Sequence, residues 1–347
     1  MLIGFAATAQ KTENVILVTL DGLRWQEVFN GADASLLNNE EFTESIERTS
    51  NKFWDESAAE RRQLLMPFLW STVKENGVIL GNRALGSKVD IKNKYGFSYP
   101  GYNEILTGYP DDKVDSNDKK YNENVTVLEY LNNQPKLKGK VAAFSTWDVF
   151  PYIINDKRSG IYVNSAGKEY EETNSPNSAL LNEIQEKIPS LASGRFDYLT
   201  YFMARDYLQE KNPNVLYIAF DETDEFAHEG KYRDYLYAAN TIDGFLEDLW
   251  SYCQSTEQYK DKTTIIVATD HGRGDKVKEQ WQSHGQKVED CQSIWIAAIG
   301  PDIKNLGEVS TAHQSHQNQI AATVAKLLGY TFENGHEIGE PIQMILK

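Results

Sequence analysis

Four short polar segments combine carboxylate and imidazole side chains at positions where apolar runs end. Three of the six histidines of the chain lie in these segments beside carboxylates, and a fifth segment, YGFSYPGYNEILTG, offers a serine hydroxyl. Carboxylate oxygens and imidazole nitrogens are ligands for zinc-like ions, so the set could hold two divalent cations over a phosphate and attack it with the serine. The residues are Asp21 in VILVTLDGLRW, Asp224 and His228 in LYIAFDETDEFAHEG, Asp270 and His271 in TIIVATDHGRG, His284 in WQSHG, and Ser98.

The Asp270-His271-Gly272 motif is the most specific of these segments. An apolar run over residues 265–268 delivers two adjacent ligands into a glycine turn, where both side chains can converge on one centre. The alternative is an Asp that caps the strand end, followed by a histidine unrelated to metal binding. His284 follows 13 residues later in a polar loop, where a surface histidine is the alternative.

Asp224 and His228 are four residues apart, so on a helix they share one face and can bind the same ion. The surrounding sequence is acidic, and a solvated helix face is the alternative. Asp21 supplies a hard oxygen ligand, and Gly22 lets the chain turn sharply beside a cation. Asp is also a favoured helix N-cap, which is the alternative for Asp21.

Ser98 precedes an apolar, helix-like stretch that ends at Gly108. Serine is a weak nucleophile, and contact with a divalent cation would lower the pKa of its hydroxyl. A serine at a helix start also brings backbone N–H groups and the positive end of the helix dipole near a phosphate. A plain N-cap role for Ser98 is the alternative.

The bulk composition indicates a globular protein of 347 residues with a formal charge of −16. This charge argues against a nucleic-acid-binding surface, because phosphate backbones are held by clustered Lys and Arg. No apolar run approaches the roughly 18 to 20 residues that span a membrane. Cys253 and Cys291 are the only cysteines, so the sequence allows one disulfide at most and no thiolate zinc site.

The first residues, MLIGFAATAQKTEN, contain a short apolar stretch that ends in Ala7-Thr8-Ala9. This pattern is similar to the cleavage site of a secretory signal, although a basic n-region is lacking. We therefore expect residues 1–12 to be a signal-peptide remnant or a disordered tail, and a periplasmic or secreted location.

Five apolar, β-branched runs predict buried strands of a parallel sheet. The segments between them carry helical periodicity, which predicts an α/β fold with a mostly parallel central sheet and helices on both faces. We expect one domain over residues 13–347, with a cap insertion near residues 151–177. Ligands of such folds gather at the carboxyl ends of the strands, where the polar segments lie. The predicted strands are 15–20, 141–144, 215–220, 263–269 and 294–299.

In order, the D-G, S-x-P, D-x-x-x-H, D-H-G and H-G motifs resemble those of the alkaline phosphatase superfamily. The resemblance extends over about residues 15–329 and is strongest to the nucleotide pyrophosphatase/phosphodiesterase branch. It implies a small-molecule phosphate ester substrate, two Zn²⁺ ions and a phosphoserine intermediate. It further implies that one ion is held by Asp21, Ser98, Asp270 and His271, and the other by Asp224, His228 and His284.

The nucleophile segment departs from this branch, which commonly has T-F-P-N-H where this chain has Ser98-Tyr99-Pro100-Gly101-Tyr102. The hydroxyl is retained, but the substrate contacts differ. The branch also places an Asn on the phosphate, for which Asn117 is the best candidate, with Asn122 and Asn124 next to it in sequence. No Arg lies in the nucleophile segment to bind a monoester dianion, which favours diesters.

Three alternatives remain open at the level of sequence. A sulfatase would need C/S-x-P-x-R, and position 102 is Tyr instead of Arg. A metal-dependent phosphomutase of the same superfamily would have to retain its product for return of the phosphoryl group. A non-catalytic metal-binding module would not require the nucleophile. The oligomeric state cannot be predicted from the sequence.

Overall fold

The computed structural model describes residues 10–171, 175–189, 194–276 and 278–347. Residues 1–9, which contain most of the expected signal remnant, lie outside the described residues. Residues 11 and 12 already contact the body of the protein, since both backbone N–H groups donate to the Asp302 carboxylate.

A mixed sheet of eight strands forms the centre of the molecule, in the order β10-β2-β9-β7-β1-β6-β4-β5. The five strands from β7 to β5 run parallel, which confirms the predicted α/β fold class. Their bounds are β1 Asn14–Leu20, β4 Val141–Ser145, β5 Tyr162–Ser165, β6 Val215–Phe220 and β7 Thr263–Ala268. The remaining strands are β2 Gly77–Leu80, β9 Ile296–Ile299 and β10 Gly307–Glu308.

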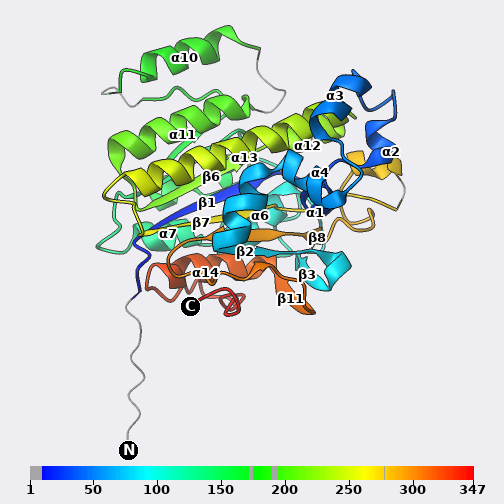
Figure 1. The fold of residues 1–347 in the computed structure, drawn as a ribbon. Coiled ribbons are helices and arrows are strands. Elements are labelled where there is room, and N and C mark those ends of the chain that lie inside the picture. The colour runs from blue at the N-terminus through cyan, green and yellow to red at the C-terminus, as the bar shows by residue number, and fades with distance from the viewer. Residues whose placement is uncertain (1–9, 172–174, 190–193, 277) are drawn as a thin grey trace, which may run out of the picture.

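Helices cover both faces of this sheet (Figure 1). Side chains of β1 alternate between the two faces: Ile16 and Val18 join a core with α11 and α13, and Val15 and Leu17 join a core with α6, α7 and α14. All seven residues of β1 are buried, as expected for a central strand with apolar side chains in both directions. These helices span α6 Ser98–Thr107, α7 Val127–Asn132, α11 Asp197–Lys211, α13 Tyr232–Ser255 and α14 Ile320–Leu327.

The other helices connect the strands, and α10 lies on the outer side of α11 (Figure 1). They are α1 Trp25–Asn30, α2 Ala34–Leu37, α3 Ile46–Phe53, α4 Ala58–Leu65, α5 Lys74–Asn76, α8 Phe150–Ile153, α9 Asp156–Ser159, α10 Ser178–Lys187 and α12 Glu222–His228. No helix within the described ranges combines the length and the apolar composition needed to cross a bilayer.

The run at 294–299 is not the single parallel strand that the sequence predicts. Residues 293–294 form β8, which joins a small sheet with β3 Ser87–Asp90 and β11 His313–His316. Residues 296–299 form β9, which runs antiparallel to β7. The connection after β7 stays at the carboxyl edge of the sheet instead of crossing over on a helix, so the chain re-enters the sheet in the opposite direction.

The segment at 151–177, expected as a cap, contains most of α8, α9 and the edge strand β5, which pairs in parallel with β4. Residues 172–174 of this segment lie outside the described residues. Cys253 and Cys291 are both buried and carry free thiols.

Candidate metal centre

Three neighbouring strands deliver the carboxylates of the centre to one edge of the sheet. Asp21 follows β1, Asp270 follows β7 by two residues, and Asp224 lies in α12, which begins directly after β6. Because β7, β1 and β6 are adjacent and parallel, their carboxyl ends meet, although the end of β1 at Leu20 is 200 residues from the end of β6 at Phe220 and 248 residues from the end of β7 at Ala268. This is the edge at which ligands of open α/β sheets bind.

Asp21, Asp270 and His271 form a fully buried cluster. Nε2 of His271 lies 3.2 Å from Oδ1 of Asp21 and 3.3 Å from Oδ2 of Asp270. These three atoms have no hydrogen-bond partner in the described part of the chain. Ligand atoms around one tetrahedral zinc, with bonds of about 2.0–2.1 Å, lie about 3.3 Å apart. The cluster therefore has the spacing of ligands that share one ion.

A second cluster contains Asp224, His228 and His284. Nε2 of His228 lies 3.2 Å from Oδ2 of Asp224 and 2.9 Å from Nε2 of His284. Nε2 of His284 lies 3.7 Å from Oδ1 of Asp224. The two clusters adjoin, because Asp224 Oδ1 lies 3.9 Å from His271 Nε2 and the rings of His271 and His284 stack with centroids 3.9 Å apart.

His271, which is buried, and His284, which is partly buried, are each oriented through the second ring nitrogen. Nδ1 of His271 lies 3.0 Å from the carbonyl oxygen of Gly272, and Nδ1 of His284 lies 3.1 Å from that of Gly96. Donation from Nδ1–H to a carbonyl leaves Nε2 as the unprotonated ligand atom. The other Asp oxygens are bonded too: Tyr102 donates its hydroxyl to Asp21 Oδ2 at 2.9 Å, and the Gly22 N–H donates to Asp270 Oδ1 at 3.0 Å.

The electrostatics of the centre favour neutral imidazoles and penalise the closely packed carboxylates. Burial lowers the pKa of His271 to about 4, and burial together with His271 lowers the pKa of His284 to about 3. Burial and the nearby Asp224 raise the pKa of Asp21 to about 7, and burial and Asp21 raise the pKa of Asp270 well above its usual value. A bound cation would relieve this repulsion between carboxylates.

Asp224 differs from the other carboxylates because a cation contacts it. Burial acts to raise the pKa of Asp224, but the Arg273 guanidinium and His228 outweigh burial, and the pKa lies well below its usual value. Arg273 donates from Nη2 to Asp224 Oδ1.

Ser98 is the first residue of α6, and its side chain is buried. The first turn of α6 packs directly on the centre: a Cβ atom at Gly101 would lie 3.1 Å from Cβ of Asp270, and Tyr102 binds Asp21. Asn117 reaches the same turn, since its Oδ1 accepts from the Tyr99 N–H at 3.0 Å. This contact places an exposed amide beside Ser98.

Asn122 and Asn124, the other two candidates for binding the phosphate, form hydrogen bonds away from Ser98. Asn122 and Asn124 are buried, and both donate to the side chain of Asn103. Asn117 therefore remains the candidate among the three.

Tyr102, Arg273 and Gly96 contact the predicted ligands but were not predicted to do so. Their partners lie far away in the chain, so no local pattern identifies them. The only signal in the sequence was their position next to motifs, as in the D-H-G-R-G run of Arg273 and the S-Y-P-G-Y run of Tyr102.

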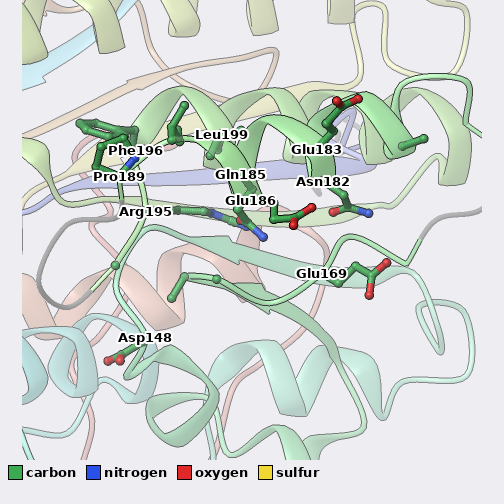
Figure 2. A pocket seen from close by; sticks show the side chains of 15 residues that line it. Asp148, Glu169, Asn182, Glu183, Gln185, Glu186, Pro189, Arg195, Phe196 and Leu199 are labelled. Atoms are coloured by element: carbon green, nitrogen blue, oxygen red, sulfur yellow. The ribbon is translucent and has the colours of Figure 1, made fainter.

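A pocket with a volume of about 780 Å³ is lined by residues other than those of the metal centre. Figure 2 shows the side chains that line it. Asp148 and Ala166, which follow β4 and β5, line it together with residues of α10. The pocket lies at the same carboxyl edge of the sheet as the metal centre. The two sites follow different strands, since β5 is two strands, or about 10 Å, from β6. Arg195 at its wall is buried, which lowers the pKa of its guanidinium to about 9. None of the predicted ligands lines this pocket.

A family model described as type I phosphodiesterase / nucleotide pyrophosphatase matches residues 29–291, which is well over half of the chain. Two curated relatives, probable 2,3-bisphosphoglycerate-independent phosphoglycerate mutases from two strains of Leptospira interrogans, are 23% identical over 223 residues. These matches cover 61% of this chain but only 38% of each mutase, so the chain spans well under half the length of these relatives.

Solved structures show the same fold at low sequence identity. Wild-type alkaline phosphatase PafA aligns with a TM-score of 0.63 and 11% identity, over 98% of this chain and 100% of that chain. The lipoteichoic acid synthase LtaP from Listeria monocytogenes aligns with a TM-score of 0.60 and 16% identity, over 95% and 75%. The phosphonate monoester hydrolase SpPMH from Silicibacter pomeroyi aligns with a TM-score of 0.59 and 13% identity, over 96% and 76%.

Proposed function

Because this chain belongs to the type I phosphodiesterase / nucleotide pyrophosphatase family, we propose that it hydrolyses phosphate esters at a two-zinc centre through a phosphorylated Ser98. Family membership confirms the resemblance seen in the motifs and supports phosphoester hydrolysis as the chemistry. The observation that carries the proposal is the convergence of three buried ligand atoms, on Asp21, Asp270 and His271, that lack any other partner among the described residues.

We assign the residues to two ions in the grouping that the resemblance implies. Asp21, Asp270 and His271, with Ser98 at the start of the adjoining helix, would hold one ion. Asp224, His228 and His284 would hold the other. When bound, such a pair lowers the pKa of a hydroxyl and neutralises charge on the attacking and leaving oxygens.

The protein itself positions the nucleophile and the phosphate. The Ser98 hydroxyl releases its proton to solvent and its Oγ attacks phosphorus in line. The bond from phosphorus to the leaving oxygen breaks, and that oxygen departs with the electron pair. Water then cleaves the Ser98–phosphate bond and restores the serine. The amide of Asn117 would donate to a phosphate oxygen, since its carbonyl side is held by the Tyr99 N–H.

The nucleophile segment supports diesters over monoesters. A monoester dianion calls for a further cation near the phosphate. The position that carries Arg in the sulfatase motif is Tyr102, and its hydroxyl binds Asp21. The second charge of a monoester would therefore have no cationic partner from this segment.

A panel of three substrates on the purified protein tests the proposal. Bis-p-nitrophenyl phosphate, p-nitrophenyl phosphate and p-nitrophenyl sulfate separate diesterase, monoesterase and sulfatase activity. We expect the diester to be turned over fastest, the activity to disappear with a chelator, and about two zinc ions per chain by elemental analysis. Turnover of the sulfate alone, or full activity in metal-free protein, would refute the assignment.

A phosphomutase is the second candidate, because both curated relatives are probable phosphoglycerate mutases. A mutase and a hydrolase would share phosphoryl transfer to an enzyme hydroxyl. They differ in the second step, because a mutase returns the phosphoryl group to the product and a hydrolase transfers it to water. Incubation with 3-phosphoglycerate separates the two candidates. Formation of 2-phosphoglycerate would favour the mutase, and release of inorganic phosphate would favour the hydrolase.

A further inference from the structure

Arg273 lies at the junction of the four segments that carry the histidine and aspartate ligands. Its side chain is fully buried. It belongs to the loop of Asp270 and His271, and it donates from Nη2 to the Asp224 carboxylate and, at 3.2 Å, to the Asp224 carbonyl. Its Nη1 donates at 3.1 Å to the carbonyl of Gln282, two residues before His284.

Arg273 also packs against the turn that follows β1. A Cβ atom at Gly22 would lie 3.2 Å from Arg273 Nε and 2.9 Å from Asp224 Oδ1, so this glycine leaves room for the guanidinium beside Asp21. One side chain therefore contacts the turn after Asp21, the helix of Asp224 and the loop before His284.

We propose that Arg273 is a positioning residue that pre-organises the Asp224, His228 and His284 ion site. The inference rests on the proposed function, because it concerns the second zinc of that centre. The guanidinium holds Oδ1 of Asp224, so Oδ2 remains for an ion shared with His228, whose Nε2 lies 3.2 Å away. Its contact with Gln282 holds the loop that delivers His284. The planar guanidinium of an arginine suits this task, because it offers several donors in a rigid arrangement. The flexible ammonium group of a lysine does not.

The geometry argues against a direct contact between Arg273 and the phosphate. The side chain has no exposed surface, and both Nη atoms donate to protein acceptors. Only Nε lacks a hydrogen-bond partner in the described part of the chain, and it faces Gly22. Arg273 therefore acts through Asp224 and His284.

A simple charge argument predicts the opposite sign of effect. A buried cation beside a cation site repels the incoming ion, so its removal would tighten metal binding. Pre-organisation predicts weaker binding after removal, by about 10- to 100-fold, as for other groups that hydrogen-bond metal ligands. The direction of the change in affinity decides between the two.

The experiment compares Arg273→Met, Arg273→Lys and the matched control Arg62→Met. Arg62 is also a structural arginine, paired with Glu308 at 2.8 Å on the far edge strand β10, and it contacts none of the ligands. Zinc stoichiometry after dialysis and zinc affinity by chelator competition are measured on each folded variant, with kcat and KM on the best substrate. Folding is checked by circular dichroism.

We expect Arg273→Met to bind one zinc tightly and the second about 10- to 100-fold more weakly than wild type. Excess zinc should restore most of its kcat, whereas KM at saturating zinc should stay unchanged. The affinity of Arg273→Lys for the second zinc should lie between those of wild type and Arg273→Met, and the affinity of Arg62→Met should match that of wild type. If Arg273→Met does not fold, weaker binding of the second zinc by Arg273→Lys supports the inference, and wild-type affinity overturns it.

Two other results would overturn the inference. Tighter zinc binding by Arg273→Met would show that the arginine competes with the ion. Unchanged zinc affinity with a raised KM would show that it contacts the substrate. A wild-type protein that binds no second zinc contradicts the proposed function itself, and this outcome is visible before any variant is made.

Discussion

Substitution of Gly22 by alanine tests whether Asp224 and His271 bind zinc in the positions that they have in this structure. Gly22 has φ +59°, and an added Cβ would lie 2.9 Å from Asp224 Oδ1 and 3.2 Å from His271 Cε1. Ordinary contacts of a Cβ begin at 3.4 Å, so the neighbouring ligands must move apart by up to about half an ångström. Gly139 is a matched control, because it has φ +75° and nothing within 4 Å of an added Cβ.

The expected effects separate into a backbone part and a site part. Alanine in the left-handed region costs roughly 1–2 kcal/mol at either position. Crowding adds roughly 1–3 kcal/mol at Gly22 alone. Metal ligands tolerate deviations of about 0.2 Å, so a shift of Asp224 by a larger amount should also weaken zinc binding. We expect a loss of about tenfold or more in zinc affinity for Gly22→Ala.

Urea unfolding of the metal-free proteins gives the stability of Gly22→Ala, Gly139→Ala and wild type, and chelator competition gives their zinc affinities. We expect both variants to lose stability, Gly22→Ala more, and only Gly22→Ala to lose zinc affinity. If Gly22→Ala binds zinc as tightly as Gly139→Ala, then Asp224 and His271 are not zinc ligands in this arrangement.

Three further predictions concern the nucleophile, a group that supports the centre and a buried carboxyl group of α6. Ser98→Ala should lower kcat by at least about 10³-fold and abolish phosphoenzyme in acid-quench labelling, and a labelled Ser98→Ala would contradict the covalent role. Tyr102→Phe removes the donor to Asp21 and should weaken zinc binding by about 10- to 100-fold, whereas zinc affinity equal to wild type would argue against this support. Glu104 is buried, and burial raises its pKa from 4.5 to about 7, so its contribution to stability is complete below pH 4.5 and is lost as pH rises through 7. The stability of wild type relative to Glu104→Gln should therefore fall by roughly 3 kcal/mol between pH 4.5 and 9, and parallel urea-unfolding profiles would refute this shift.

Local patterns were sufficient to predict the fold class and to place the segments that carry the candidate ligands at one edge of the sheet. Apolar runs of β-branched residues predicted β1, β4, β6 and β7 within about one residue, because buried parallel strands need apolar side chains on both faces. The step from an apolar strand to Asp and His placed the candidate ligands at the carboxyl ends. Prediction was less successful for β9, whose direction depends on a connection without the crossover α-helix that a parallel strand needs.

Tertiary structure alone decided which candidate ligands meet and which groups support them. Asp21 is far in the chain from Asp270 and His271, and its contact with His271 depends on β7 pairing with β1. The same holds for the supporting groups, since Tyr102 reaches Asp21 across 81 residues and Arg273 reaches Asp224 across 49. A sequence determines which side chains are available and on which elements they lie. Their distances are decided by strand order and by the packing of α6 on the sheet, which no local pattern encodes.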